Sequence, residues 1–189
     1  MREVNGNLFE PEQLGLGNFD AICITTNGYV RKDGCAVMGR GCAKAAADKW
    51  PYFPRLLGAQ IRNFGNSPIV LTIDQRYAVV TFPVKPILVK YCKEVDHLVM
   101  EKYKSKFAND GRFVPGWACK ADFDLIDRSA SRIRKLTDRM GWQRVVTVRP
   151  GCGNGELDWA AVKPMLEKHF DDRFYVITFG RREYAPRQE

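Results

Sequence analysis

Two patterns of hydrophobic and polar residues alternate along this chain. Short, nearly continuous apolar and β-branched runs are typical of strands buried on both faces of a sheet; they lie at residues 19–26, 69–73, 77–82, 144–149 and 174–179. Stretches with helical character lie between or after them, at residues 37–49, 55–64, 122–140 and 159–170. This alternation predicts an α/β protein with three layers, in which helices cover both faces of a mixed, mostly parallel central sheet.

The stretch 122–140 carries the clearest helical pattern. Its apolar residues recur at three- and four-residue steps and predict one buried face, formed by Phe123, Ile126, Ala130, Ile133, Leu136 and Met140. Asp122 stands where the helix dipole favours negative charge, and Gly141 is a suitable C-terminal cap. The runs 69–73 and 77–82 are close enough to form a hairpin, which makes the sheet mixed.

Residues 86–116 do not follow this alternation. They contain Pro86, a stretch of mixed charge, and turn sequences at 109–111 and 115–116. We therefore expect one domain over residues 1–180 with an insertion at about 86–116 that has its own short helix. Residues 181–189 are expected to form a basic C-terminal tail.

Composition narrows the choice of partners. The chain of 189 residues has a net charge of +8, which favours anionic partners. It has neither an apolar run long enough to span a membrane nor the apolar core of a signal peptide, so we expect a cytoplasmic protein that binds no membrane. Six scattered cysteines without a C-x-x-C pair and only two histidines predict neither a metal site nor a cofactor.

Two glycine clusters each lie between a predicted strand and a predicted helix. Residues 25–43 read TTNGYVRKDGCAVMGRGCA, and residues 149–159 read RPGCGNGELDW. Ligands of open α/β sheets bind beyond the carboxyl ends of the strands, where glycine lets backbone amides approach a phosphate closely. The two clusters therefore predict a diphosphate held from both sides, the alternative being tight turns that require positive φ. Neither the P-loop motif nor G-x-G-x-x-G is present.

In combination, five short motifs resemble a known family. They are GNLF at 6–9, DAICITTN at 20–27, VMGRGCA at 37–43, FPVK at 82–85 and GCGNGELDW at 151–159. In this order they resemble the macro domain, the ADP-ribose-binding α/β/α fold. The last two are similar to those of a subgroup that includes the antitoxin partners of DNA ADP-ribosyltransferase toxins and the terminal ADP-ribose glycohydrolases. The resemblance covers nearly the whole chain apart from 86–116.

The resemblance implies a role for each matching position. Asn7 stands where the family has an aspartate that receives the adenine amino group, and Asn27 matches the asparagine that contacts the distal ribose. Phe179 is expected to stack on adenine or to pack in the core. The full set of residues expected to bind the ligand is Asn7, Leu8, Asn27, Met38, Gly39, Gly41, Gly151, Cys152, Gly153, Asn154, Gly155 and Phe179.

Lys85 matches the lysine that glycohydrolases of this subgroup use at the anomeric carbon, and we expect Lys85 and Asn27 to be catalytic. A lysine at a strand end inside a cleft can lose its proton through desolvation and then act as a nucleophile. The alternative is an ordinary surface lysine. Ile87 and Val84 depart from the histidine and threonine that accompany this lysine in relatives.

Three functions follow from these observations. The first is a hydrolase that acts at the distal ribose of ADP-ribosylated nucleic acid or protein, or on ADP-ribose 1-phosphate. The second is a non-catalytic reader of ADP-ribose. The third is a nucleic-acid-binding protein with a vestigial pocket, which would use a basic stripe on the helix 122–140 formed by Arg128, Arg132, Lys135 and Arg139; a solvated helix surface is the plainer interpretation of that stripe.

Overall fold

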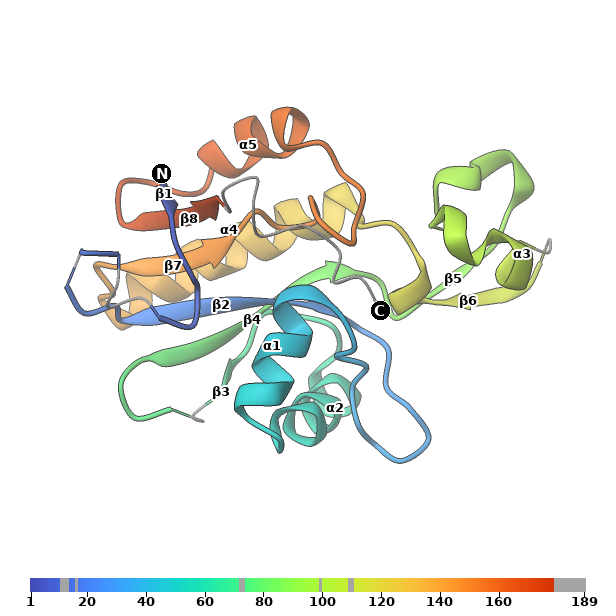
Figure 1. Cartoon of the computed structure of the whole chain (residues 1–189), viewed down its shortest axis with the longest axis horizontal. Helices are drawn as coiled ribbons and strands as arrows, with labels where there is room; N and C mark the ends of the chain where they lie inside the picture. Colours follow the sequence, from blue (N-terminus) through green and yellow to red (C-terminus); the bar gives the residue numbers. More distant parts are fainter. Residues whose placement is uncertain (11–13, 16, 72–73, 99, 109–110, 179–189) are drawn as a thin grey trace, which may run out of the picture.

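A six-stranded sheet forms the centre of the molecule (Figure 1). The computed structural model describes residues 1–178 except 11–13, 16, 72–73, 99 and 109–110. The strand order is β1-β8-β7-β2-β4-β3, and every neighbouring pair is parallel except β3 and β4. The strands are β1 (Arg2–Asn5), β2 (Ala21–Asn27), β3 (Val70–Leu71), β4 (Ala78–Lys85), β7 (Val145–Val148) and β8 (Phe174–Thr178).

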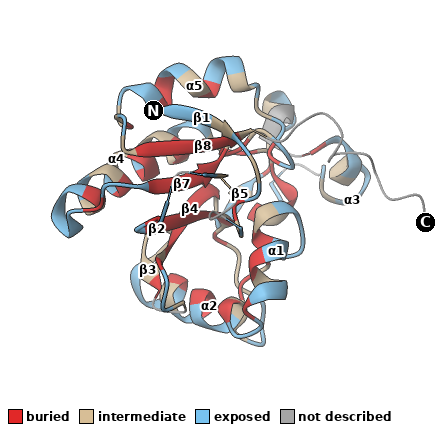
Figure 2. Cartoon of the chain, turned by 60° about the vertical axis from the view of Figure 1, so that its left-hand side comes forward, coloured by how far each residue is buried: buried red, intermediate tan, exposed pale blue. Residues whose placement is uncertain are grey.

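Helices cover both faces of this sheet, which gives three layers (Figures 1 and 2). The helices are α1 (Gly41–Lys49), α2 (Phe53–Phe64), α4 (Phe123–Met140) and α5 (Trp159–Glu167). Successive side chains of a strand point to opposite faces. Accordingly, Ile22 and Ile24 pack with α1 and α2 in one hydrophobic core, whereas Ala21 and Cys23 pack with α4 and α5 in another. The predicted three-layer α/β/α architecture with a mixed, mostly parallel sheet is confirmed.

Residues 88–118, which we call the lobe, lie at one end of the sheet (Figure 1). The antiparallel strands β5 (Leu88–Lys90) and β6 (Phe113–Pro115) form a second sheet. Between and after them lie 3-10 helices at Lys93–Leu98, Glu101–Tyr103 and Gly116–Ala118 and the short helix α3 (Lys104–Phe107). The lobe has a small hydrophobic core of its own, made with Cys119, that includes Tyr91, Val114 and Ala118.

A bulge interrupts the pairing of β2 with β4 at their carboxyl ends. Thr26 lies opposite Pro83, but the next residue, Asn27, lies opposite Lys85. Val84 is therefore the extra residue of β4. A bulge of this kind changes the direction in which the following side chain points, and here it brings Lys85 into register with Asn27.

Some predicted boundaries were wrong. Helix α1 begins at Gly41 and not at residue 37, because Val37 is held in a loop: its amide donates to the carbonyl of Tyr29 (3.0 Å) and its carbonyl accepts from Asn27. Strand β1 was not predicted, since it is a largely exposed edge strand with a single apolar residue. At the two ends of α4, Phe123 and Met140 are exposed rather than buried.

Candidate active site

Two glycine loops meet at the carboxyl edge of the parallel strands. The first glycine loop, residues 28–41, follows β2, and the second glycine loop, residues 150–157, follows β7. They approach each other closely, since a Cβ added at Gly41 would lie 3.1 Å from Nδ2 of Asn154. Helices α1 and α5 begin after these loops, so free backbone amides and the positive ends of two helix dipoles lie at this edge.

Glycine occupies the positions in the two loops for different physical reasons. Gly151 has a φ of 78°, and a Cβ at Gly155 would lie 2.3 Å from the carbonyl oxygen of Gly151, so both are required by the turn itself. By contrast, a Cβ at Gly39 would have nothing within 4 Å. Gly39 and Gly153 are exposed. The second loop is thus held by its own packing, while the exposed backbone at Gly39 remains accessible to a ligand.

Asn27 fixes the shape of the first glycine loop. Its Nδ2 donates to the carbonyl of Val37 (2.7 Å), and its Oδ1 accepts from the amide of Tyr29 (3.0 Å). A carboxamide has two N–H groups and an oxygen with two lone pairs. One donor and one acceptor position therefore remain for a ligand after the loop has been held.

Lys85 is the buried cationic residue of this site. Only 7% of it is exposed. Its Nζ donates to the carbonyl of Asn154 in the second glycine loop (2.8 Å) and contacts Sδ of Met100 in the lobe (3.4 Å). Burial lowers the pKa of Lys85 to about 8, because removing water from an ammonium group favours its neutral form.

The two contacts suit a neutral amine. A neutral amine has two N–H groups and one lone pair. When these N–H groups point to the Asn154 carbonyl and to Met100, the lone pair is free to attack an electrophile. Lys85 thus has the environment of a lysine nucleophile rather than of a surface lysine.

Charged residues of three segments act on Lys85 from a greater distance. Glu156 stabilises its ammonium form and opposes the effect of burial, whereas Lys102 and Arg40 destabilise it. Glu156 has a φ of 62°, a conformation that non-glycine residues rarely adopt, and it lies 4.0 Å from Lys120. Glu156 carries the one carboxylate of the second glycine loop, and the surrounding structure must hold its backbone in this rare conformation.

The other predicted site residues lie in several environments. Asn7 is exposed, and its Oδ1 accepts from the amide of Phe9 (3.0 Å), so it caps the opening turn. The side chains of Leu8 and Met38 are buried in the hydrophobic core, which leaves their backbone for a ligand. Burial raises the pKa of the Cys152 thiol to about 11, so this cysteine stays protonated near neutral pH. Phe179 lies outside the described residues.

The basic stripe of α4 is exposed at all four positions, Arg128, Arg132, Lys135 and Arg139. The side chain of Arg132 donates to the hydroxyl of Ser67. One of these four cationic side chains therefore already has a hydrogen-bond partner within the protein.

Sequence reasoning missed two residues in or next to the lobe that lie close to Lys85. Met100 contacts its amine, and Cys119 lies close enough for Lys85 to influence the thiol, whose pKa burial raises to about 11. No local pattern marks Met100, because its role depends on how the lobe folds back. Among the residues that the structure describes, no three His, Cys, Asp or Glu side chains gather as metal ligands would, and no helix is long and apolar enough to cross a membrane.

Comparison with solved structures defines the class of fold. The chain aligns with the macrodomain of Mycobacterium tuberculosis DarG with a TM-score of 0.64 and 18% identity, over 94% of this chain and 95% of that one. For the macrodomain of Thermus aquaticus DarG the values are 0.63 and 16%, over 95% and 97%. Thermosipho africanus DarTG, solved in complex with ADP-ribose, gives 0.65 and 13% over 97% of this chain and 42% of that one.

These similarities show that the chain has the macrodomain fold, as its motifs predicted. More particularly, the similar structures include the macrodomains of DarG proteins. No family model matches the sequence, and no curated protein sequence matches it.

Proposed function

We propose that this chain binds ADP-ribose between its two glycine loops and hydrolyses a bond at the distal ribose. The observation that carries the proposal is Lys85, a buried lysine with a pKa of about 8 that lies opposite Asn27 in the sheet. The macrodomain fold and the similarity to a DarTG protein solved with ADP-ribose support the choice of ligand.

Binding would use backbone more than side chains. The diphosphate would lie against the exposed amides near Gly39 and Gly153, where the beginning of α1 favours negative charge. The remaining donor and acceptor of Asn27 would meet hydroxyls of the distal ribose. The opening turn at Asn7 would receive adenine through a neutral amide oxygen in place of a carboxylate.

Catalysis would begin with the lone pair of Lys85. Its Nζ attacks the anomeric carbon, the bond from that carbon to the leaving group breaks, and the bonding electron pair departs with the leaving group. The nitrogen then loses one proton to water, and its remaining proton moves to the ring oxygen as the bond between that oxygen and the anomeric carbon breaks, which gives a lysine imine. Water adds to this imine and releases ADP-ribose and the free amine. The cationic character of the carbon in the transition state is stabilised by the neighbouring anionic diphosphate.

The test compares three substrates with one protein. An ADP-ribosylated oligonucleotide, an ADP-ribosylated protein and ADP-ribose 1-phosphate are incubated with the wild type, with Lys85→Ala and with Lys44→Ala, and products are identified by mass spectrometry. Lys44 is an exposed lysine of α1 that pairs only with Asp48 among the described residues, and it serves as the matched control. We expect at least one substrate to release ADP-ribose, and Lys85→Ala to lower that rate by at least about 100-fold.

The pH dependence and a binding measurement complete the test. Since only the neutral amine attacks, the rate should rise with pH to a plateau above about 8. ADP-ribose at about 100 times its dissociation constant should stabilise both Lys85→Ala and wild type by roughly 2.7 kcal/mol without a divalent metal. Full activity of Lys85→Ala would overturn the catalytic assignment. A wild type that binds ADP-ribose but releases nothing from all three substrates would instead be a reader.

A further inference from the structure

Five consecutive carbonyl groups, at the end of β4 and just beyond it, accept hydrogen bonds from other parts of the chain. Two of the donors come from α4 and its cap, one from the segment after α2, one from the first glycine loop and one from the lobe. The pairs are Ser129 Oγ with Pro83 (3.0 Å), the Asp122 amide with Val84 (2.9 Å), Asn66 Nδ2 with Lys85 (2.9 Å), the Gly28 amide with Pro86 (3.3 Å) and the Gly116 amide with Ile87 (2.9 Å). Four separate segments therefore hold the backbone that carries the amine.

Carbonyl groups provide this anchoring because the local sequence is poor in amide hydrogens. Pro83 and Pro86 stand on either side of Val84 and Lys85, and neither has an N–H to donate. Lys85 is also confined to extended conformations, since it precedes a proline. Asn66 donates to the carbonyl of the lysine itself, so among these five contacts it is the one nearest to the amine along the chain.

Asn66 is in turn held by the elements around it. Gly65, with a φ of 78°, follows α2, and its amide closes the last turn of that helix (2.9 Å). On the other side, the carbonyl of Ser67 accepts from the hydroxyl of Thr81 in β4 (3.2 Å). A Cβ added at Gly28 would lie 2.6 Å from Nδ2 of Asn66, so the carboxamide has its space because residue 28 is glycine. The donor is thus presented to Lys85 from a fixed position.

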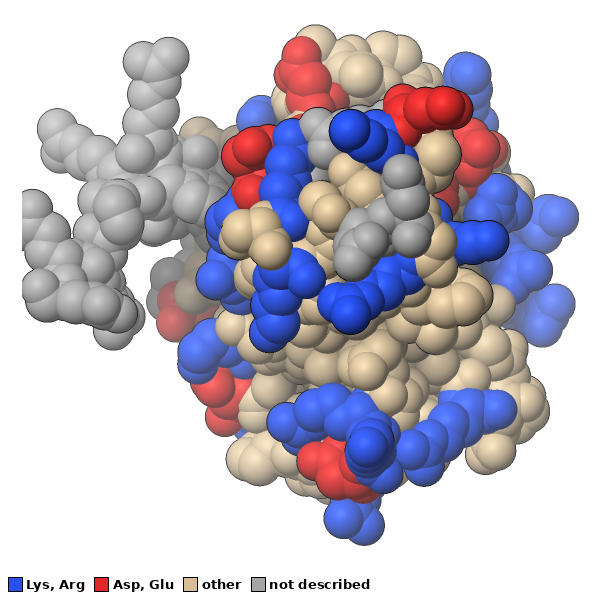
Figure 3. Space-filling view, turned by 90° about the vertical axis from the view of Figure 1, so that its right-hand side faces the viewer, with Lys and Arg blue, Asp and Glu red and all other residues tan. Residues whose placement is uncertain are grey.

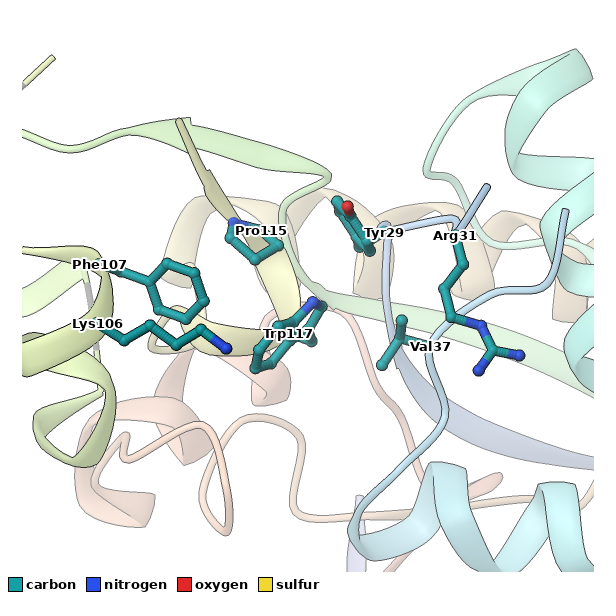
Figure 4. Close-up of a pocket in the computed structure, with 7 residues that line it drawn as sticks. All are labelled: Tyr29, Arg31, Val37, Lys106, Phe107, Pro115 and Trp117. Carbon is teal, nitrogen blue, oxygen red and sulfur yellow. The ribbon is translucent and has the colours of Figure 1, made fainter. Parts of the chain in front are cut away.

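The same backbone connects Lys85 with a cavity of about 590 Å³ between the first glycine loop and the lobe (Figure 4). Tyr29 lines this cavity from the loop and Trp117 from the lobe. Each of them follows a glycine whose amide donates to the carbonyl of Pro86 or of Ile87. The positions of both walls therefore depend on the course of the chain beyond Lys85.

The amine of Lys85 is sensitive to small changes in this backbone. Its Nζ contacts the Asn154 carbonyl (2.8 Å) and Sδ of Met100 (3.4 Å), which belong to the second glycine loop and to the lobe. A displacement of about 1 Å takes a hydrogen bond out of its range. Misplacement of a reacting group by this amount can cost about 100-fold in rate.

We propose that Asn66 is a positioning residue for Lys85, and that its carboxamide, acting through the Lys85 carbonyl, keeps the amine against the Asn154 carbonyl and away from water. Asn66 takes no part in the making and breaking of bonds. Without its donor the end of β4 can move, the amine gains water, and the pKa of Lys85 rises because its ammonium form is no longer desolvated. This inference rests on the proposed function, since it assigns a further residue to the same site.

The first measurement observes the amine of Lys85 directly and needs no substrate. Isotope-labelled lysine is incorporated, the chemical shift next to each amine is followed with pH by NMR, and Lys85→Met assigns the Lys85 signal. Many Lys and Arg side chains are exposed on the face at this end of the molecule (Figure 3). Exposed lysines titrate near pH 10.4, so Lys85, with a pKa of about 8, is separated from them.

Three variants are compared with the wild type. Asn66→Leu has a similar shape but no donor, and Asn66→His can donate from Nδ1 in place of the carboxamide. Asn63→Leu is the matched control, because Asn63 lies exposed in the last turn of α2 without a side-chain hydrogen bond in the described part of the chain. We expect the Lys85 midpoint to rise by at least about one pH unit in Asn66→Leu, to return toward the wild-type value in Asn66→His and to stay unchanged in Asn63→Leu.

Kinetics on the substrate that the wild type hydrolyses give a second readout. Asn66→Leu should lower kcat by about 10- to 100-fold and leave KM within about twofold, since Asn66 acts on the lysine and not on the ligand. The pH at which the rate reaches its plateau should rise together with the NMR midpoint. Asn66→His should recover most of kcat, whereas a merely structural role would change stability without moving either pH value.

The outcomes separate this inference from the proposed function. An unchanged Lys85 midpoint in Asn66→Leu overturns the inference, as does a raised KM with an unchanged kcat. If Asn66→Leu does not fold, as judged by circular dichroism, the same criteria apply to Asn66→Ala. If the wild type hydrolyses none of the three substrates, the proposed hydrolysis fails, while a raised midpoint in Asn66→Leu still supports control of the amine by Asn66. If the wild type is active and the midpoint does not move, the proposed function stands and this inference fails.

Discussion

At the scale of single residues, the buried ammonium group of Lys85 lowers the stability of the folded protein at neutral pH. Burial disfavours its charged form, and no carboxylate pairs with it in the described part of the chain. The unfolded chain exposes this lysine to water, where its pKa is about 10.4. Between about pH 8 and pH 10.4 the unfolded state binds more protons than the folded state, so the lysine makes stability rise with pH in that window.

Lys85→Met should therefore stabilise the protein, and most strongly at neutral pH. Methionine fills a similar volume without charge. Relative to wild type, we expect a gain in the free energy of unfolding at pH 7 that shrinks by about 2 kcal/mol at pH 10, as judged from the pKa difference. Urea unfolding at the two pH values measures it. Lys44→Met, at an exposed position, should have about the wild-type free energy of unfolding at both pH values. If Lys85→Met differed from the wild type by the same amount at both pH values, that result would contradict the lowered pKa.

At the scale of elements, predictions from the sequence were accurate where the determinants are local. Helix α4 has the predicted boundaries, because Asp122 caps its first turn and Gly141 adopts the left-handed conformation at its end. The predicted start of α1 was wrong because Asn27, fourteen residues before Gly41, holds the loop that precedes the helix. The end of β4 likewise depends on pairing with β2 and not on its own sequence.

The candidate site divides in the same way. The glycine loops and Lys85 were predicted as parts of the site from short motifs, since their spacing within the chain is what matters to a turn or a strand end. The contacts of Lys85 with Met100 and with the Asn154 carbonyl join segments far apart in sequence. Tertiary packing alone creates them.

The N-cap of α4 offers a test at this scale. The carboxylate of Asp122 accepts from the amide of Leu125 (2.8 Å), and its own amide donates to the carbonyl of Val84 (2.9 Å). Asp122→Ala should lower the free energy of unfolding by about 1 kcal/mol, while Asp122→Asn should retain most of the cap. Urea unfolding measures both. Asp124→Ala, at an exposed first-turn position without a capping bond in the structure, should cost less; an equal cost would show that charge rather than capping dominates.

At the scale of the whole molecule, the lobe and the α/β/α body have separate cores but share one site. The strands that connect them end with Leu88 opposite Pro115, so the chain enters and leaves the lobe at one place. Met100 covers the Lys85 amine from the lobe side. The body therefore contains Lys85, the proposed nucleophile, and the lobe contributes to its protonation state.

Replacing residues 89–114 with a short glycine linker should leave the body folded and ADP-ribose affinity within a few-fold. Water would then reach Lys85, and its pKa would rise from about 8 toward the ordinary value of about 10.4. We expect hydrolysis at pH 7.5 to fall at least tenfold and to recover as the pH approaches 10. Pre-steady-state rates across this pH range measure the change. Met100→Ala should shift the profile in the same direction by less, and an unshifted profile in both variants would show that the lobe does not control the amine.

The bulge at Val84 has a consequence for how such a site can be gained or lost. Side chains alternate along a strand, so the number of residues between Pro83 and the lysine decides toward which side of the sheet the amine points. Removing the single residue Val84 would leave every reactive group in the sequence and would still place the lysine opposite Asn27, but it would abolish the bulge and change the direction in which the amine leaves the strand. Descendants of one ancestor can thus differ in chemistry through a one-residue gap, and a comparison that counts only shared lysines and asparagines would score them as identical.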